Sequence, residues 1–198
     1  MSRQPKFIAI CGTNGTGKTF LTKHKLLPQL KRRYLVVDND GGEPDWLHLP
    51  PLDLSKARDC ANFETARTCY LWYQNENDKG KFWKYIYMNV HDAVIVLDDC
   101  RDYIPPNITN EDSLRNVFSR RRQKMNDMII IQHSLKDIPK GLIQYLNAII
   151  LFNTDDTPED IATRLGQKWV YDIAVDVQKK ARTNPYYHTI IDLKNLSA

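Results

Sequence analysis

The sequence predicts a three-layer α/β/α fold, in which helices cover both faces of a mostly parallel central sheet. Short segments rich in β-branched residues alternate with segments whose apolar residues recur at helical spacing. Several strand-like segments are apolar at nearly every position, as strands buried on both faces of a parallel sheet must be. The 198 residues match the size of one domain, so we expect residues 1–198 to form a single domain.

Six segments are predicted strands, because each is short, rich in β-branched residues and bounded by residues that favour turns. They are Phe7–Cys11, Tyr34–Asp38, Ala93–Asp98, Met128–Gln132, Ala148–Phe152 and Thr189–Leu193. Since both faces of such a sheet are apolar, helices must lie above and below it.

Three later segments are predicted helices, namely residues 109–125, 157–166 and 169–181. The first begins with a capping box formed by Thr109 and Asp112. In the second, Thr157 can cap the helix, Pro158 occupies the first helical position and Gly166 ends it. The third carries a single apolar stripe at helical spacing. These helices alternate with strands along the chain.

Residues 60–90 give a less regular pattern. Four of their side chains share one helical face, and these are Phe63, Ala66, Tyr70 and Tyr73. A polar loop is expected over Asn75–Lys81, and Phe82–Val90 fits either a helix or a strand. We interpret the many aromatic residues here as packing groups rather than as a platform for stacking bases.

The composition is that of a globular domain, with 42% hydrophobic and 26% charged residues. No apolar run approaches the roughly 20 residues that a membrane-spanning helix needs. The N-terminal residues lead into a predicted strand without the apolar region of a signal peptide, so we expect a cytoplasmic protein. The four cysteines are then expected to be thiols, because their spacing fits neither a zinc site nor a C-x-x-C pair.

The net charge of +4 is unevenly distributed. Basic residues cluster in Lys23–Arg33, Arg120–Lys124 and Lys179–Arg182. Such clusters can neutralise phosphates of a nucleic acid, but they can equally be solvated helix faces and loop ends.

The most specific motif follows the first predicted strand. It matches G-x-x-x-x-G-K-[ST] and consists of Gly12, Thr13, Asn14, Gly15, Thr16, Gly17, Lys18 and Thr19, with Phe20 next in the chain. Glycines let the backbone wrap a phosphate, and the helix that begins here adds its positive dipole end. We expect Lys18 to face solvent in the site and reach the β- and γ-phosphates, and Thr19 to bind Mg²⁺. The motif predicts a P-loop NTPase whose residues 12–20 bind ATP.

A second motif, Ala93–Asp99, supplies the carboxylates that ATP hydrolysis requires. Its apolar strand ends in Asp98 and Asp99, as a Walker B motif does. We expect this strand to neighbour the one before the phosphate loop, with Asp98 holding Mg²⁺ and Asp99 orienting or deprotonating the attacking water.

The order of these motifs, followed by Ser119–Arg122 and Met128–Ser134, resembles the FtsK–HerA superfamily of P-loop ATPases. The resemblance covers about residues 6–153, and the phosphate loop is its most specific part. It implies that Gln132, at a strand end, senses the γ-phosphate, with His133 as the rival for this role. It also implies that one arginine of Arg120–Arg122 is the finger that completes the active site of a neighbouring subunit.

The superfamily includes the genome-packaging ATPases of tailless viruses with internal membranes and the Zot-like assembly proteins of filamentous phages. The resemblance implies a motor that acts as a homo-oligomeric ring and translocates nucleic acid, with DNA the expected polymer. Capsid or vertex proteins would be partners, and the setting would be a host cytoplasm or a virion. Zot-like proteins carry a membrane anchor; the absence of an apolar run here favours genome packaging.

The helical phase singles out Arg121 as the candidate finger. It shares a face with Leu114, Val117, Phe118 and Met125. A guanidinium is costly to bury unpaired, so either the helix ends before Arg121 or the side chain emerges at a subunit boundary facing phosphate. The alternative is that Arg121 pairs with an internal carboxylate.

Other functions remain open at this point. A GTPase switch is suggested by Asp38–Gly41 and by Asn153–Asp156. Against it, Thr154 replaces the lysine that packs against the base, and Asp98 and Asp99 would have no role. A small-molecule or nucleotide kinase would use Arg120–Arg122 to clamp phosphates. A nucleotide-binding protein without turnover would leave Asp99 and Gln132 incidental.

Overall fold

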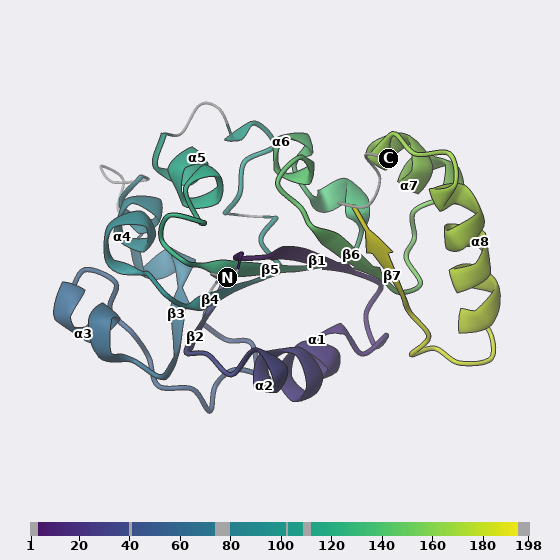
Figure 1. The fold of residues 1–198 in the computed structure, drawn as a ribbon. Coiled ribbons are helices and arrows are strands. Elements are labelled where there is room, and N and C mark those ends of the chain that lie inside the picture. The colour runs from purple at the N-terminus through teal and green to yellow at the C-terminus, as the bar shows by residue number, and fades with distance from the viewer. Residues whose placement is uncertain (1–3, 40, 74–79, 102, 109–111, 194–198) are drawn as a thin grey trace.

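The computed structural model describes residues 4–39, 41–73, 80–101, 103–108 and 112–193. Within these residues one sheet has the strand order β3-β2-β4-β5-β1-β6-β7 (Figure 1). The strands are β1 Phe7–Cys11, β2 Tyr34–Asp38, β3 Thr65–Cys69, β4 Val94–Asp98, β5 Asp127–Gln132, β6 Ala148–Leu151 and β7 Thr189–Asp192. All the pairings are parallel except that of β7 with β6, so the predicted three-layer fold with a mostly parallel sheet is confirmed.

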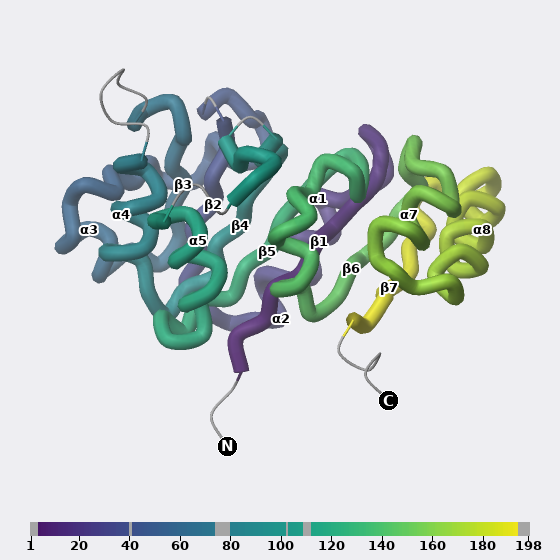
Figure 2. Tube along the Cα trace, turned by 90° about the horizontal axis from the view of Figure 1, so that it is seen from above, coloured from purple at the N-terminus to yellow at the C-terminus, as the bar shows by residue number. Residues whose placement is uncertain are grey.

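Helices lie on both faces of the sheet (Figures 1 and 2). Below it in Figure 1 runs one helical segment, made of α1 Lys18–Leu21, a π-helical turn Thr22–Leu26 and α2 Leu27–Leu30. The other helices are α3 Ala57–Asn62, α4 Lys81–Asn89, α5 Asp112–Ser119, α6 Lys140–Ile143, α7 Pro158–Leu165 and α8 Val170–Ala181. Short 3₁₀ helices occur at Tyr70–Tyr73 and Leu135–Asp137. Helices α4, α5 and α6 cover the upper face, and α7 and α8 lie at the β7 end.

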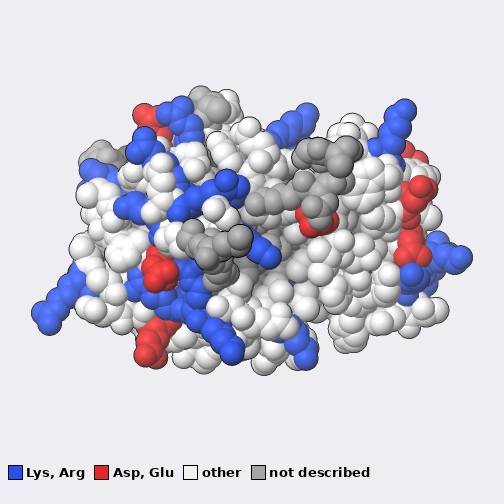
Figure 3. Space-filling model, in the orientation of Figure 1, with Lys and Arg blue, Asp and Glu red and all other residues white. Residues whose placement is uncertain are grey.

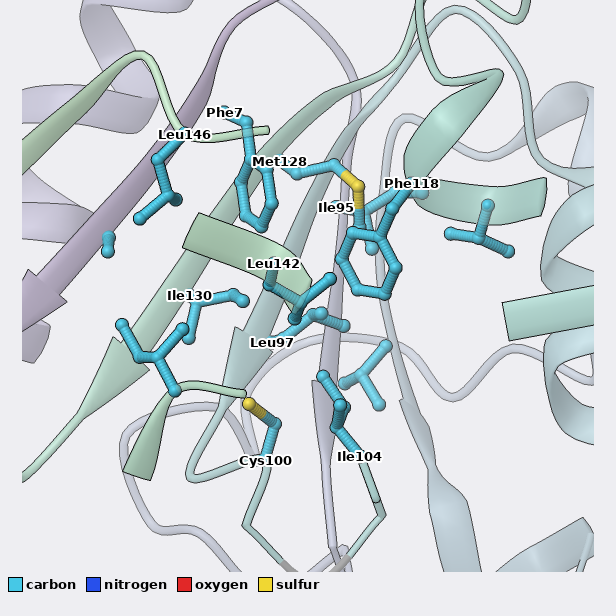
Figure 4. Packing of buried hydrophobic residues seen from close by; sticks show 14 of the residues in the cluster. Phe7, Ile95, Leu97, Cys100, Ile104, Phe118, Met128, Ile130, Leu142 and Leu146 are labelled. Atoms are coloured by element: carbon cyan, nitrogen blue, oxygen red, sulfur yellow. The ribbon is translucent and has the colours of Figure 1, made fainter. Parts of the chain in front are cut away.

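Two apolar clusters form the core, one on each face of the sheet. Phe7 and Ala9 of β1 belong to the upper cluster, and Ile10 belongs to the lower one, as strand alternation requires. Figure 4 shows the upper cluster, where Phe118 of α5 and Leu142 of α6 pack on the sheet. The strands are thus fixed in register by side chains that are buried on both faces.

The six predicted strands are confirmed to within one residue at each end, but β3 was missed. The sequence pattern put Ala66 on a helical face, whereas residues 65–69 form a parallel strand in which Thr65 pairs with Tyr34. Ala66 and Thr68 are buried and Arg67 is half-buried, which is the alternation of a strand. Pairing with β2 therefore determines the structure of this segment, despite the helical spacing of its apolar residues.

The ambiguous segment Phe82–Val90 proves to be helical, as α4. Helix α5 is shorter than the predicted 109–125, because the chain turns after Ser119. Thr109 of the predicted capping box lies outside the described residues, as does most of the loop Asn75–Lys81. The Thr157 cap and the end at Gly166 are confirmed, with the Thr157 hydroxyl accepting a hydrogen bond from the Asp160 amide at 3.1 Å.

One arginine of the basic cluster Lys23–Arg33 forms intramolecular ion pairs and is not a free cation for binding phosphate. Arg32 donates to the Asp127 carboxylate at 2.7 Å and also pairs with Asp92. The Asp127 side chain, at the start of β5, is only 3% exposed. Its buried negative charge is therefore stabilised by the ion pair with Arg32.

Replacing Arg32 with alanine should lower the free energy of unfolding by about 3 kcal/mol, because a buried carboxylate then loses its ion-pair partner. The matched control is Arg115→Ala, whose pair with Asp112 is exposed and should contribute less than about 1 kcal/mol. Urea unfolding of both variants measures the difference, and equal losses would contradict this role for Arg32.

Candidate functional site

The phosphate loop begins where β1 ends, between two other strands. The Gly12 amide donates to the Gln132 carbonyl at 3.1 Å, and the Thr13 amide donates to the Asn153 carbonyl at 2.8 Å. The start of the loop is therefore tied to the ends of both β5 and β6. A Cβ on Gly12 would lie 2.6 Å from Cβ of Phe152 and 2.7 Å from Oγ1 of Thr16, which explains glycine here.

The other two glycines of the loop have a conformational role. Gly15 has φ +76° and Gly17 has φ +89°, in the region that side chains disfavour. Helix α1 begins directly after Gly17, and the Leu21 amide donates to the Gly17 carbonyl at 2.9 Å. The loop thus leads the backbone into a helix N-terminus, an arrangement that favours an anion.

Lys18 lies inside the loop rather than facing solvent as expected. Its residue is only 7% exposed, and its amine donates to the Thr13 carbonyl at 2.9 Å. Burial lowers the pKa of Lys18, while Asp98, Cys11 and Asp99 oppose this shift. The amine is a partly desolvated cation held over the loop.

A cavity of about 420 Å³ brings the predicted site residues together. Its lining includes Asn14, Gly15, Gly17, Lys18, Thr19, Phe20, Asp98, Asp99, Gln132 and His133. Sequence analysis placed Asp98 on the strand next to β1, but β5 lies between β4 and β1. Gln132, at the end of β5, therefore lies between Asp98 at the end of β4 and the end of β1, where the phosphate loop starts.

Asp98 is held by a residue that sequence analysis missed. The indole Nε1 of Trp46 donates to Oδ2 of Asp98 at 2.5 Å, and Trp46 is fully buried. Desolvation raises the pKa of Asp98 to about 6; the Trp46 hydrogen bond and Lys18 lower it, and Glu43 and Asp99 raise it. No motif marks Trp46, because it comes from the irregular segment between β2 and β3.

Asp99 stands at the mouth of the cavity. Its backbone has φ +41°, and its side chain is 49% exposed. The carboxylate accepts from Nε of Arg101 at 3.1 Å and lies 3.7 Å from Nε2 of His133. Asp99 is thus a half-exposed carboxylate close to His133.

Gln132 is 1% exposed and has one half of its amide engaged. Its Nε2 donates to Sγ of Cys100 at 2.8 Å. Its Oε1 is buried and has no hydrogen-bond partner among the described residues. Such an orphaned acceptor is rare in folded proteins and marks a group suited to receive a hydrogen bond from a ligand or water.

Arg121 does not lie with these residues. It is 4% exposed and donates to the carbonyls of Phe118 at 3.2 Å and Tyr145 at 3.0 Å, near the start of β1. Burial lowers its pKa, with Arg122 adding to the shift. The helix ends before Arg121, as one of the expected alternatives had it, and the turn after α5 points the guanidinium at carbonyl oxygens rather than at a carboxylate.

The features that suggested other functions also have local roles. Asp156, which would read guanine, is 2% exposed and accepts hydrogen bonds from the Ser134 hydroxyl and the Leu135 amide. Asp38 accepts a hydrogen bond from the Gly41 amide in a turn, and Asp40 lies outside the described residues. Arg120 bonds to Tyr87, far from the carboxyl ends of the strands where a kinase acceptor would sit.

The raised pKa of Asp98 predicts a stability effect in the protein without Mg²⁺ or nucleotide. Because folding favours the protonated form, this contribution is complete below pH 3.8 and is lost as the pH rises through about 6. Asp98→Asn should therefore be more stable than the parent at pH 7.5, by about 1–3 kcal/mol. Urea unfolding in EDTA between pH 4.5 and 7.5 tests this; an advantage that does not shrink toward pH 4.5 would contradict it.

Comparisons with solved structures agree with this fold. The genome packaging NTPase B204 from Sulfolobus turreted icosahedral virus 2, in complex with ATP-gammaS, superposes with a TM-score of 0.75 at 15% identity, over 99% of this chain and 96% of that one. B204, the DNA-packaging ATPase from Sulfolobus turreted icosahedral virus, gives 0.71 at 18% identity, over 98% and 95%. VirB4 of Thermoanaerobacter pseudethanolicus gives 0.55 at 11% identity, over 86% and 84%.

A comparison with curated protein sequences gave no significant match. The part of the chain that the structure describes contains no helix long and apolar enough to cross a membrane. The sequence profile of the family described as zonular occludens toxin (Zot) matches residues 8–148, which is most of the chain and includes the phosphate loop, Asp98 and Gln132. The protein therefore belongs to the zonular occludens toxin (Zot) family.

Proposed function

We propose that this protein is a Mg²⁺-dependent ATPase that works as a ring and moves DNA during viral genome packaging. The observation that carries the proposal is the convergence of Lys18, Asp98 and Gln132 around one phosphate loop and one cavity. The similarity to B204 supports the fold that such a motor needs, and the order of motifs along the chain supports the ring.

The cavity fits a triphosphate with its metal. Backbone N–H groups of the loop and the partly desolvated Lys18 amine supply the positive potential for the β- and γ-phosphates. Thr19 and Asp98 line the same cavity and are the hydroxyl and carboxylate that would hold Mg²⁺. When bound, the metal would supply positive charge that neutralises the charge developing on the phosphates.

Hydrolysis needs a positioned water beside the γ-phosphate. The free Oε1 of Gln132 can accept a hydrogen bond from that water, because the amide nitrogen is already held by Cys100. Asp99 at the cavity mouth can then accept the proton, as a half-exposed carboxylate within reach of solvent. The position of β5 between β4 and β1 supports this role for Gln132, because Gln132 ends the strand between the phosphate loop and Asp98.

DNA binding is supported by the charge on the surface. Figure 3 shows Lys and Arg side chains gathered on the left half of the face, over α4, α5 and the start of β1. Lys124 lies 5.1 Å over the Tyr87 ring, and Arg120 and Arg122 are exposed there. These groups can neutralise backbone phosphates, and Arg120 or Arg122 is better placed than the buried Arg121 to reach a neighbouring subunit.

Lys18→Ala should abolish tight ATP binding and the DNA-stimulated ATPase activity that we expect of the parent chain, because no other cation in the described residues lies within the phosphate loop. Lys168→Ala removes an exposed lysine outside the site and is the control. ATP affinity and the ATPase rate, each with and without single- and double-stranded DNA, are the measurements. The proposal would be contradicted if Lys18→Ala bound ATP with undiminished affinity. It would also be contradicted if DNA did not change the ATPase rate of the parent chain and the chain instead transferred phosphate to a small acceptor.

Asp99→Asn and Gln132→Ala should each slow hydrolysis by roughly 10²–10⁴ while leaving ATP affinity nearly unchanged, since both groups act on the water. Asp98→Asn should instead weaken Mg²⁺-dependent binding. Single-turnover rates and binding titrations separate the two effects. If His133→Ala is inactive while Gln132→Ala turns over normally, the sensor is the histidine.

A further inference from the structure

A second groove, of about 590 Å³, opens directly beside the phosphate loop. It shares Thr16, Gly17 and Phe20 with the loop and the first turn of α1. Its other walls include Phe152, Tyr186 and His188, which come from the end of β6 and the segment that precedes β7. Aromatic rings from opposite ends of the chain thus meet next to the site for the phosphates.

Two of these rings are unusually exposed. Phe20 is 62% exposed and Tyr186 is 63% exposed, although both are large and mainly apolar. The Tyr186 ring lies against the loop, since its Cδ1 is 3.2 Å from the position of a Cβ on Gly17. The His188 ring packs on Phe152 with 4.7 Å between ring centroids. The groove therefore has aromatic surfaces on both sides that no side chain covers fully.

The segment that carries Tyr186 and His188 is held in place. Antiparallel pairing of β7 with β6 sets Thr189 opposite Leu151, which brings the preceding residues to the loop. The Tyr186 amide donates to the Asn184 side chain at 3.1 Å, and the Tyr187 amide donates to the Asn184 carbonyl at 2.9 Å. The groove is thus a feature of the folded chain.

We propose that this groove binds the nucleobase of the triphosphate, with Tyr186 and Phe20 as its stacking surfaces. The inference rests on the proposed function, because it assumes that the phosphates lie on residues 12–19. Only a ribose separates a base from its phosphates, so the base must lie in a surface continuous with the loop. The groove is continuous with it through Thr16 and Gly17 and offers the flat apolar surfaces that a base prefers.

The chemistry of the walls also sets the specificity. Aromatic rings and the Leu21 side chain dominate the lining, and its polar groups belong to Lys25, His188, Thr16 and the hydroxyl of Tyr186. Stacking is tolerant of base identity because every base has a π-face, whereas discrimination needs several fixed hydrogen bonds to the base edge. Adenine and guanine nucleotides should therefore bind with affinities within about tenfold of each other.

The test is calorimetric titration of the full chain with ATPγS, GTPγS and inorganic tripolyphosphate, each with Mg²⁺. Tyr186→Ala should weaken ATPγS and GTPγS roughly 5- to 100-fold and leave tripolyphosphate unchanged. Tyr186→Trp should retain nucleotide affinity. The matched control is Tyr171→Ala, which removes a partly exposed tyrosine of α8 that does not line the groove.

The possible outcomes separate this inference from the function on which it rests. Unchanged ATPγS affinity in Tyr186→Ala, with tripolyphosphate still bound, would overturn the base site and leave the phosphate loop standing. Equal losses for ATPγS and tripolyphosphate would also overturn it, because the tyrosine would then act on the loop alone. If the parent chain binds none of the three ligands, the phosphate site fails and the base site fails with it.

Discussion

The geometry of the site depends on two backbone hydrogen bonds at the beginning of the phosphate loop. Through them Gly12 and Thr13 fasten the loop to the ends of β5 and β6 on either side of β1. These strands are buried on both faces, so their ends are fixed by the core rather than by the loop. The same anchoring places Gln132 against the loop and Phe152 beside the second groove. Packing in the core therefore fixes the positions of the polar groups that follow the carboxyl ends of these parallel strands.

Two charged side chains at this edge of the sheet, Lys18 and Asp98, are largely removed from solvent. Lys18 and Asp98 are both drawn toward their neutral forms by burial, and each partly offsets the shift of the other. Their present partners are the Thr13 carbonyl and the Trp46 indole. Phosphates and Mg²⁺ carry more charge than these neutral partners, so ligand binding would stabilise the ionised forms of both groups. This is the physical reason to expect that metal and triphosphate bind together.

The sequence predicted what rests on local patterns. The phosphate loop, the acidic strand end and the two-face burial of the strands were visible because each has a motif or a period. Features that depend on contacts between distant segments could not be predicted. Strand β3 forms by pairing with β2, and Trp46 donates its hydrogen bond to Asp98, which lies 52 residues further along the chain. The surroundings of Arg121 were not predictable either, because they depend on the end of α5 at Ser119, whereas the helical pattern continued to residue 125.

The roles assigned to the site residues remain predictions, and the groove at Tyr186 had no sequence signal. Tyr186 lies near the C-terminal end of the described chain, and only the antiparallel pairing of β7 brings it to Gly17. Residues that belong to a motif can therefore be recognised from the sequence, whereas residues that the topology brings to the site cannot.

The most direct measurement of the central claim is a crystal structure with Mg²⁺ and a non-hydrolysable ATP analogue. We expect the β- and γ-phosphates to lie on the backbone of residues 13–18 and the Lys18 amine to leave the Thr13 carbonyl for them. The metal should lie between the Thr19 hydroxyl and the Asp98 carboxylate, with Gln132 facing the γ-phosphate. A nucleotide bound elsewhere, or a metal that does not approach Asp98, would contradict the account.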